Sequence, residues 1–222
     1  MHIYGSTVSP FVQRVLMTAR ARGHEIAVQA PLGGNMRSAE FQAISPTGRI
    51  PVLALDDGRH ICESEAIVQY LDETLSGPPI MPAAPLDRAR VREIVAVGLG
   101  EFAAGLRPLM VHLIFRMGEA PDVIAAARGQ SELGLKALDR LLDRAGTHAV
   151  GNTLTPADCA LVPMLTLAEL IDPVAGSMTV VKSHAPVHAY WQRIAADRNA
   201  KRTIDEMRTG FAAMMARNKA KA

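Results

Sequence analysis

The stretch SPFVQR, residues 9–14, follows closely on the apolar opening Ile3-Tyr4. This pattern predicts a strand, a short loop and a helix, with Ser9 at the N-cap and Pro10 at the first helical position, where these residue types are favoured. The first N–H groups of a helix lack intrahelical partners, and the helix dipole places partial positive charge beside them. A hydroxyl at this position is therefore suited to a site that binds an anion.

The rest of the first 75 residues combines short β-rich runs with two amphipathic segments. The runs are bounded by Gly, Pro and Asp residues, and Asp56-Asp57-Gly58 predicts a hairpin turn between the last two. We expect strands at His2–Tyr4, Glu25–Ala30, Pro51–Leu55 and Arg59–Cys62, and helices at Pro10–Arg22 and Ser64–Leu75. The order βαβ followed by ββα is that of a small thioredoxin-like α/β domain.

The second half of the chain is of a different kind. Residues 76–85, SGPPIMPAAP, hold four prolines and cannot continue a helix, so they predict a linker. Beyond it, Thr155 and Asp158 stand at capping-box spacing, with Pro156 at the first helical position. We expect a helix that begins at Pro156, and others at Leu86–Met117, Pro121–Ala145, Pro186–Ala196 and Lys201–Ala216. The expected division is a thioredoxin-like domain at 1–76, a linker at 77–85 and an all-α domain at 86–222.

The composition of the 222 residues narrows the functional class. A hydrophobic content of 49% is ordinary for a globular protein, and a net charge of +2 gives no reason to expect a nucleic-acid partner. Cys62 and Cys159 form no CxxC or metal-ligand spacing, and the seven histidines are scattered without acidic partners, so we expect no metal. The start shows no signal-peptide pattern, and apolar runs such as Ala160–Leu165 are too short to span a membrane. We therefore expect a cytoplasmic protein without a membrane partner.

Taken together, SPFVQR at 9–14, IPVL at 50–53 and ESEAI at 63–67 resemble, in order and spacing, the glutathione-binding half of cytosolic glutathione S-transferases. With the linker and the capping box, the resemblance covers nearly the whole chain. The SPFxxR string is similar to the tau class, which has serine here, and to the omega class, which has cysteine. Because serine cannot form a mixed disulfide with glutathione, the resemblance implies a serine-type enzyme for conjugation or peroxide reduction rather than thiol transfer.

The resemblance implies that Ser9 is the catalytic residue, whose hydroxyl donates a hydrogen bond to the glutathione sulfur. A free thiol titrates near ~8.5, and each unit of pKa depression requires about 1.4 kcal/mol of preference for the thiolate. A charge-assisted hydrogen bond and a helix dipole can supply roughly one to two such units. Ser6 and Thr7 are nearby hydroxyls that remain alternatives, and without the resemblance Ser9 is an ordinary N-cap.

The resemblance also assigns the other parts of glutathione. The backbone of Ile50, before a cis Pro51, is implied to pair with the cysteinyl part, and Arg49 to lie near the glycyl carboxylate. Glu63 is implied to bind the γ-glutamyl ammonium, and Ser64 the carboxylate of the same group. Without a ligand, Arg49 is an exposed cation and Ser64 an N-cap. An electrophile pocket is expected from residues whose spacing equally fits plain core packing: Val8, Leu32, Leu106, Met110 and Ile114.

The function expected from the resemblance is that of a cytoplasmic, homodimeric glutathione transferase of detoxification. Its substrates are glutathione and a small hydrophobic electrophile, and no other cofactor is implied. A non-catalytic ligand-binding or adaptor protein of the same fold is the alternative, since fold alone does not determine function. An isomerase of the zeta class is a third reading. That class carries Ser-Ser-Cys-Ser at this loop, where this chain has STVS at 6–9.

Overall fold

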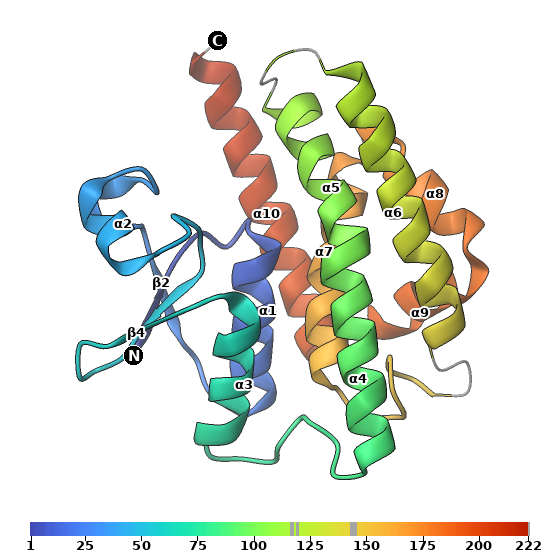
Figure 1. The fold of residues 1–222 in the computed structure, drawn as a ribbon, viewed down its shortest axis with the longest axis horizontal. Helices are drawn as coiled ribbons and strands as arrows, with labels where there is room; N and C mark the ends of the chain where they lie inside the picture. Colours follow the sequence, from blue (N-terminus) through green and yellow to red (C-terminus); the bar gives the residue numbers. More distant parts are fainter. Residues whose placement is uncertain (116–117, 119, 143–145, 222) are drawn as a thin grey trace. The chain divides into compact units, whose positions relative to one another are not determined.

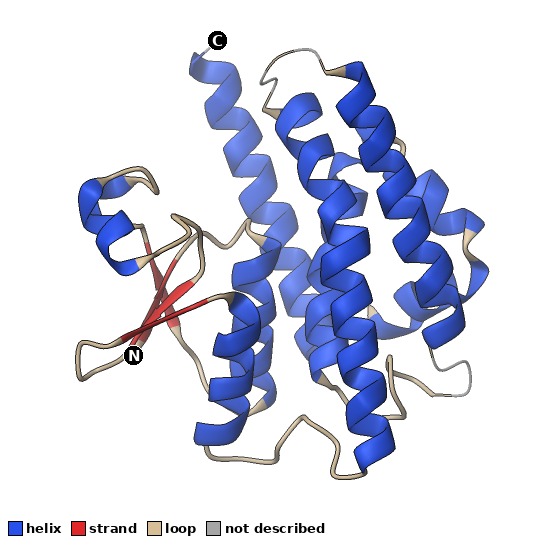
Figure 2. Cartoon of the chain, in the orientation of Figure 1, coloured by secondary structure: helices blue, strands red, loops and turns tan. Residues whose placement is uncertain are grey.

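The structure is a computed structural model that describes residues 1–222 except 116–117, 119, 143–145 and 222. The chain divides into two compact units, Met1–Ile80 with Asp205–Ala222, and Met81–Ile204. All strands of the described residues lie in the first unit, while the second contains helices (Figure 1, Figure 2). The fold class expected from the sequence, a small α/β domain and an all-helical one, is therefore confirmed. The units differ from the expected domains in that the end of the chain groups with the N-terminal unit.

Four strands of three residues each form the sheet of the first unit. Their order is β2-β1-β3-β4, with β1 parallel to β2 and antiparallel to β3, and β3 antiparallel to β4. This is the expected βαβ unit followed by a hairpin, although the last three strands are shorter than the sequence runs that predicted them. Their bounds are β1 His2–Tyr4, β2 Ala27–Gln29, β3 Val52–Ala54 and β4 His60–Cys62.

The register of the sheet brings three loops to one end. Tyr4, the last residue of β1, pairs with Val52, the first of β3, and Val52 pairs with Cys62, the last of β4. Because these neighbours run antiparallel, the end of β1, the start of β3 and the end of β4 lie in one row. The segments that follow or precede them, 5–9, 50–51 and 63–64, therefore meet at the same edge of the first unit.

Two helices, at 10–21 and 64–74, cover one face of this sheet, and a third, at 39–44, lies on the other side (Figure 1). α1 (Pro10–Ala21) and α3 (Ser64–Thr74) pack together, and their apolar residues recur at helical spacing, so each presents one face to the strands. The core between them is formed by buried residues of both helices and of the strands: Ile3, Val12, Val15, Leu16, Ala19, Leu53, Ile67 and Leu71.

The helix α2 (Ala39–Ile44) and the short 3-10 turn η1 (Leu32–Gly34) are not predicted from the sequence. The hydroxyl of Ser38 accepts a hydrogen bond of 3.1 Å from the N–H of Phe41, which caps the start of α2. Phe41 is the buried residue of this six-residue helix. A helix with one buried position shows no apolar periodicity, which explains why the sequence pattern did not reveal it.

The second unit is built of helices packed on one another. The expected helix Leu86–Met117 is found up to Ile114, and the expected helix Pro121–Ala145 is found up to Leu141. Met117 and Ala145 lie outside the described residues. α8 was not expected; Gly176, at a φ of 64°, separates it from the helix before it. The bounds are α4 Pro85–Val97, α5 Ala103–Leu109, α6 Pro121–Leu141, α7 Pro156–Ala175, α8 Ser177–Ser183, α9 Ala185–Ile194 and α10 Arg198–Lys221, the last of which continues into the first unit.

The first of these helices runs without a break from Pro85 to Ile114 and contains two π turns, η2 (Gly98–Phe102) and η3 (Met110–Ile114). By length and composition alone this helix could cross a membrane, contrary to the expectation from the short apolar runs. Its apolar residues instead face α6 and α7, against which α4 and α5 pack. The buried ones are Val91, Ile94, Val95, Leu106 and Leu109. A core helix of a globular protein meets the same criteria, so this one is weak evidence for a membrane span.

Two helical glycines allow α5 and α6 to approach closely. A Cβ at Gly134 on α6 would lie 2.5 Å from the backbone nitrogen of Phe102. A Cβ at Gly105 on α5 would lie 2.6 Å from the backbone nitrogen of Ser131. Since backbone atoms cannot move aside as flexible side chains do, both positions require glycine.

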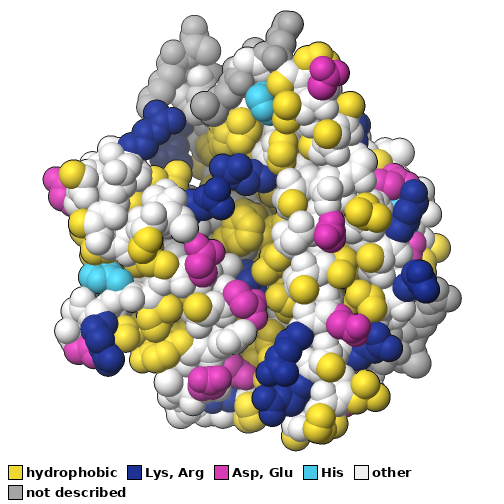
Figure 3. All heavy atoms as spheres, viewed as in Figure 1, with side chains coloured by type: hydrophobic (Ala, Val, Ile, Leu, Met, Phe, Trp, Pro, Cys, Tyr) yellow, Lys and Arg dark blue, Asp and Glu magenta, His cyan; other side chains and the backbone are white. Residues whose placement is uncertain are grey.

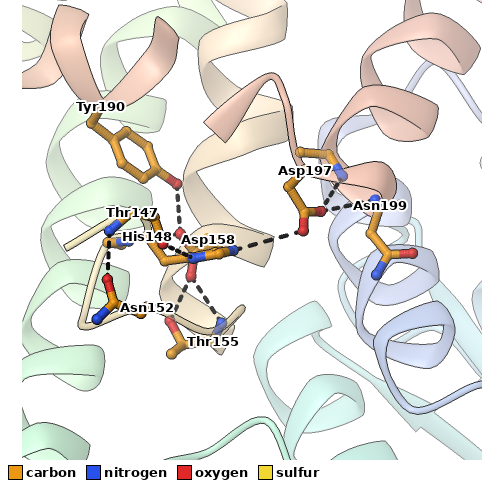
Figure 4. A network of polar contacts seen from close by, with 10 residues as sticks. Thr147, His148, Asn152, Thr155, Asp158, Tyr190, Asp197 and Asn199 are labelled. Carbon is orange, nitrogen blue, oxygen red and sulfur yellow. Dashed lines mark hydrogen bonds and ion pairs between the residues drawn. The ribbon is translucent and has the colours of Figure 1, made fainter. Parts of the chain in front are cut away.

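A buried carboxylate fixes the start of α7 (Figure 4). Oδ2 of Asp158 accepts hydrogen bonds from the N–H and the hydroxyl of Thr155, both at 2.8 Å, which is the reach-back expected of the capping box. Oδ1 accepts from the N–H of Ala149 at 2.8 Å and from the hydroxyl of Tyr190 on α9 at 3.0 Å. Burial raises the pKa of Asp158, and the hydrogen bonds from Ala149 and Thr155 oppose that rise. The network ties three segments of the second unit to one group.

The surface carries charges of both signs. On the face shown in Figure 3, basic and acidic side chains are interspersed among hydrophobic ones. This mixture reflects 24 basic and 22 acidic residues in the chain. It differs from the broad basic patch by which proteins attract nucleic acid.

Candidate active site at the edge of the sheet

Ser9 lies where the sequence places it, at the N-cap of α1 with Pro10 at the first helical position. Its carbonyl accepts hydrogen bonds from the N–H groups of Val12 and Gln13, at 3.1 and 3.0 Å. Its hydroxyl is half-buried and forms no hydrogen bond within the described part of the chain. The hydroxyl is therefore available to a ligand beside the positive end of α1.

The two alternative hydroxyls lie in the same loop but are more exposed than Ser9. The carbonyl of Ser6 accepts a hydrogen bond of 2.9 Å from the N–H of Ser9, which closes a tight turn. The carbonyl of Thr7 accepts one of 2.9 Å from the side-chain amide of Gln13. Neither contact involves a hydroxyl, so all three hydroxyls remain candidates, with Ser9 the one at the helix start.

The peptide bond between Ile50 and Pro51 is cis, as the resemblance implies. Ile50 lies just before β3 and makes no backbone–backbone hydrogen bond among the described residues. The preceding loop is held by the buried Ser45, whose hydroxyl donates to the carbonyl of Arg49 at 2.9 Å and accepts from its N–H at 3.0 Å. Ser45 is not predicted from the sequence, since nothing in the residue pattern distinguishes it from other loop serines.

Arg49 is exposed, and its guanidinium has no ion pair or hydrogen-bond partner in the described parts of the chain. Its backbone is fixed on both sides by Ser45, while its side chain is free to meet an anion. This arrangement places a cation next to the backbone groups of Ile50.

Glu63 has an unusual backbone conformation. Its φ of 66° is the only positive φ of a non-glycine residue among those described. A residue with a Cβ adopts this conformation at a cost of about 1–3 kcal/mol, and such residues gather at functional sites. Its exposed carboxylate accepts a hydrogen bond of 3.4 Å from the hydroxyl of Thr47, and the rest of its capacity is open to solvent.

Ser64 begins α3 and is in contact with the fully buried Arg14 of α1. Nη1 of Arg14 lies 3.2 Å from Oγ of Ser64, and Nη2 lies 2.6 Å from Oε2 of Glu65. Arg14 enters the SPFxxR pattern only through its spacing from Ser9, and its contact with Ser64 is not predicted from the sequence. The ion pair with Glu65 compensates a charge that burial would otherwise make very unfavourable.

Cys62 precedes Glu63 and is half-buried. Its thiol donates a hydrogen bond of 3.2 Å to the carbonyl of Ile44. Burial, together with the negative charge of Glu63, raises the pKa of this thiol. Cys62 therefore remains protonated at neutral pH and is unsuited to act as a nucleophile.

The residues expected in an electrophile pocket are divided between the two units. Val8 lies in the Ser9 loop and Leu32 in η1, both in the first unit. Leu106, Met110 and Ile114 lie on the long helix of the second unit, where Leu106 is fully buried in the core. Met110 and Ile114 belong to the π turn η3, whose period differs from that of an α-helix, so the face on which they lie does not follow from their spacing to Leu106.

One prediction about histidines is wrong. Nδ1 of His184 lies 2.6 Å from Oδ2 of Asp139 on α6, so this buried histidine has the acidic partner that the sequence did not show. The two residues are 45 positions apart, which is why the sequence pattern did not reveal the pair. The contact joins α6 to the start of α9 and has a structural role.

The chain is similar to proteins of one family along most of its length. Residues 3–79 match the glutathione S-transferase N-terminal domain, and residues 129–202 match the glutathione S-transferase C-terminal domain. A probable glutathione S-transferase of Zea mays, BZ2, is 30% identical over 222 residues, covering 93% of this chain and 91% of that protein.

Other relatives carry a different name. The probable maleylacetoacetate isomerase 1 of Drosophila melanogaster is 32% identical over 136 residues, and the maleylacetoacetate isomerase of Mus musculus is 33% identical over 138 residues. These matches cover 60% and 62% of this chain, and the chain spans 53% and 62% of the length of those two proteins. The tau-like or omega-like closeness expected from the SPFxxR string is not confirmed by these relatives.

Solved structures agree on the fold. The tau-class glutathione S-transferase MiGSTU of Mangifera indica is 25% identical, with a TM-score of 0.76 over 96% of this chain and 97% of that one. A maleylacetoacetate isomerase from Methylobacterium extorquens AM1, solved with bound malonate and GSH, is 24% identical, with a TM-score of 0.73 over 93% and 97% of the two chains. Since both domains match and the relative from Zea mays aligns along nearly the whole of both proteins, this chain belongs to the glutathione S-transferase family.

Proposed function

We propose that this protein is an enzyme that binds reduced glutathione at the edge of the sheet and activates its thiol as a thiolate. The thiolate then attacks an electrophilic carbon or a peroxide. The observation that carries the proposal is the free hydroxyl of Ser9 at the start of α1, in one row with the cis Pro51 and with Glu63 and Ser64.

The proposed role of Ser9 is to donate a hydrogen bond to the sulfur. At neutral pH only a few per cent of a free thiol is ionised, because its pKa is about 8.5. The hydroxyl and the positive end of α1 both stabilise a negative sulfur more than a neutral one. Lowering the pKa by one to two units would leave a large fraction of bound glutathione as the nucleophile. Serine in place of cysteine at this position supports conjugation over thiol transfer.

The other residues match the charges of the tripeptide. Glutathione carries a carboxylate at each end and an ammonium beside one of them. Arg49 offers a free cation for the glycyl carboxylate, and the unpaired backbone of Ile50 suits the cysteinyl part. Glu63 offers an open carboxylate for the ammonium, and Ser64 a hydroxyl at a helix start for the γ-glutamyl carboxylate.

We further propose that the protein is a cytoplasmic homodimer.

Isomerisation is a second candidate, favoured by the names of the relatives from Drosophila melanogaster and Mus musculus. The same thiolate can add to one carbon of a cis double bond conjugated to a carbonyl. The bond then rotates as a single bond, and elimination returns the thiolate and the trans product. Glutathione is regenerated in this reaction, whereas conjugation consumes it. The loop STVS at 6–9 lacks the cysteine of the zeta-class run, which favours conjugation.

The experiment that tests the proposal is the ultraviolet absorbance of the thiolate of bound glutathione, measured against pH for the wild type and Ser9→Ala. We expect the thiol to titrate well below its free value in the wild type and near its free value in Ser9→Ala. Ser6→Ala and Thr7→Ala are matched controls from the same loop and should behave as the wild type. Binding with an unshifted thiol would support a carrier, and no binding at all would support an adaptor.

A parallel assay separates the two reactions. The wild type is supplied with 1-chloro-2,4-dinitrobenzene or with a cis-enedione dicarboxylate, and free glutathione is measured over time. Conjugation lowers the glutathione concentration in step with the product. Isomerisation converts the dicarboxylate while the glutathione concentration stays constant.

A further inference from the structure

The loop that carries Ser9 is held by a buried amide on α1. Gln13 is fully buried, and its Nε2 donates hydrogen bonds to the carbonyl of Thr7 at 2.9 Å and to Oε2 of Glu206 at 3.2 Å. An amide nitrogen has two hydrogens, and these two acceptors use both. The orientation of Gln13, and with it the position of the Thr7 carbonyl, therefore depends on Glu206.

Glu206 lies on α10, in the segment that groups with the first unit. Both of its carboxylate oxygens lie 2.8 Å from Nη2 of Arg20, whose side chain is 7% exposed. Gln13 and Arg20 are seven residues apart on α1 and so share one face of that helix. Arg20 thus holds the carboxylate in the place where its Oε2 accepts the hydrogen bond from Gln13.

Gly210 provides a second, independent contact between α10 and the loop. A Cβ at this position would lie 2.9 Å from Cγ2 of Val8 and 3.5 Å from Oγ1 of Thr7. Glycine weakens a helix interior relative to alanine, so its presence in α10 calls for a physical reason. The close approach of Val8, the residue directly before Ser9, supplies one.

We infer that the segment of α10 from Glu206 to Gly210 sets the position of the loop Thr7–Ser9, with Gln13 and Gly210 as positioning residues for the Ser9 hydroxyl. The catalytic part of this inference rests on the proposed function, whereas the anchoring of the loop does not. When the Thr7 carbonyl is released or Val8 is displaced, the hydroxyl loses its fixed direction toward the sulfur. The groups assigned to the rest of glutathione, Ile50, Glu63 and Ser64, lie on other segments and keep their places.

The test compares Gln13→Met and Gly210→Ala with the wild type. Gln13→Met keeps the length of the side chain and removes both donors. Gly129→Ala is the matched control, because Gly129 is also a helical glycine and a Cβ there would meet nothing within 4 Å. Three quantities are measured: hydrogen exchange of the Ser9 amide, whose N–H donates to the carbonyl of Ser6, without ligand; the glutathione dissociation constant; and the pKa of the bound thiol.

We expect exchange of the Ser9 amide to be about tenfold faster in both variants. Turnover at pH 7 should fall about three- to eightfold, because the thiolate fraction falls by this factor when the thiol pKa rises by about one unit from about 6.5–7.5. The glutathione dissociation constant should stay within about twofold of the wild-type value, and Gly129→Ala should match the wild type in all three. Val8→Ala combined with Gly210→Ala removes the methyl groups that the new Cβ would meet, so it should restore the thiol pKa. The free energy of unfolding of the same variants, measured in urea, separates this local effect from a general loss of stability.

Two results would overturn the inference. One is unchanged exchange of the Ser9 amide in both folded variants, which would show that α10 does not anchor the loop. The other is a thiol pKa that is lowered in the wild type and equally lowered in both variants. If the wild type itself leaves the thiol unshifted while exchange rises in the variants, the anchoring stands and the proposed function fails.

Discussion

Nη1 of Arg14 on α1 lies 3.2 Å from Oγ of Ser64 at the start of α3. A guanidinium has only donors, so the hydroxyl oxygen of Ser64 must accept this hydrogen bond. Among the described residues the proton of the same hydroxyl has no acceptor, and it is therefore left to donate. Arg14 makes Ser64 a donor to an anion, which is the role that the proposed γ-glutamyl site requires.

We predict that Arg14→Met weakens glutathione binding about tenfold, because the direction of the Ser64 hydroxyl is no longer fixed. Binding is measured by calorimetry with glutathione and with an analogue that lacks the γ-glutamyl α-carboxylate. The analogue should bind the variant and the wild type alike. Equal losses for both ligands would show that Arg14 acts through general folding instead, and circular dichroism provides the control for the folded state.

The conformation of Glu63 leads to a second prediction. Its φ of 66° suits glycine, so Glu63→Gly removes the strain of this conformation. Glycine also gives the unfolded chain more entropy, which opposes this gain. The free energy of unfolding should therefore stay unchanged or rise by about 1 kcal/mol. Glu63→Ala keeps the Cβ, so its free energy of unfolding should not rise. Both variants lack the carboxylate and should bind glutathione more weakly. A glycine variant clearly less stable than the alanine variant in urea would contradict this account, and full glutathione affinity in Glu63→Ala would remove the assignment of the γ-glutamyl site.

The buried pair at the start of α7 predicts a pH dependence of stability. Burial, and next the negative charge of Asp158, raise the pKa of Tyr190 well above its usual value near 10. Above about pH 10 the phenol of Tyr190 loses its proton in the unfolded chain and retains it in the folded chain. The free energy of unfolding therefore falls as the pH rises. Tyr190→Phe should abolish this fall of about 1.4 kcal/mol per pH unit, while costing about 1 kcal/mol near pH 7 for the lost hydrogen bond. Urea unfolding from about pH 7 to 11 measures both, and parallel curves of stability against pH for the two proteins would contradict the prediction.

The close packing of α5 against α6 gives a fourth prediction. Gly134→Ala places a Cβ against the backbone of Phe102 and should lower the free energy of unfolding by about 1–3 kcal/mol. Gly129→Ala, on the exposed side of the same helix, should raise it by about 0.5–1 kcal/mol, since alanine favours helix more than glycine does. Thermal and urea denaturation of the pair measure the difference. If both substitutions changed the free energy of unfolding alike, helix propensity and not the contact with Phe102 would determine the effect.

The sequence predicts those features that depend on local pattern. Pro10 and Ser64 mark helix starts, and the β-rich runs with the turn at Asp56-Asp57-Gly58 predict the sheet. Arg14 and Ser64, like Gln13 and Glu206, are far apart in the chain and meet only through packing, which no periodicity reveals. The same holds for the end of α10, whose pattern predicts a helix but not the unit on which it packs.

The two π turns have a consequence for how this chain is compared with others. Each π turn accommodates one more residue than the α-helix around it, so the side chains that follow are rotated relative to an uninterrupted helix. A relative whose helix is regular throughout would have to be aligned with single-residue gaps inside the helix, near Gly98–Phe102 and Met110–Ile114. An alignment that confines gaps to loops would match residues from different faces, about 100° apart for each inserted residue, and would misassign the side chains after each turn.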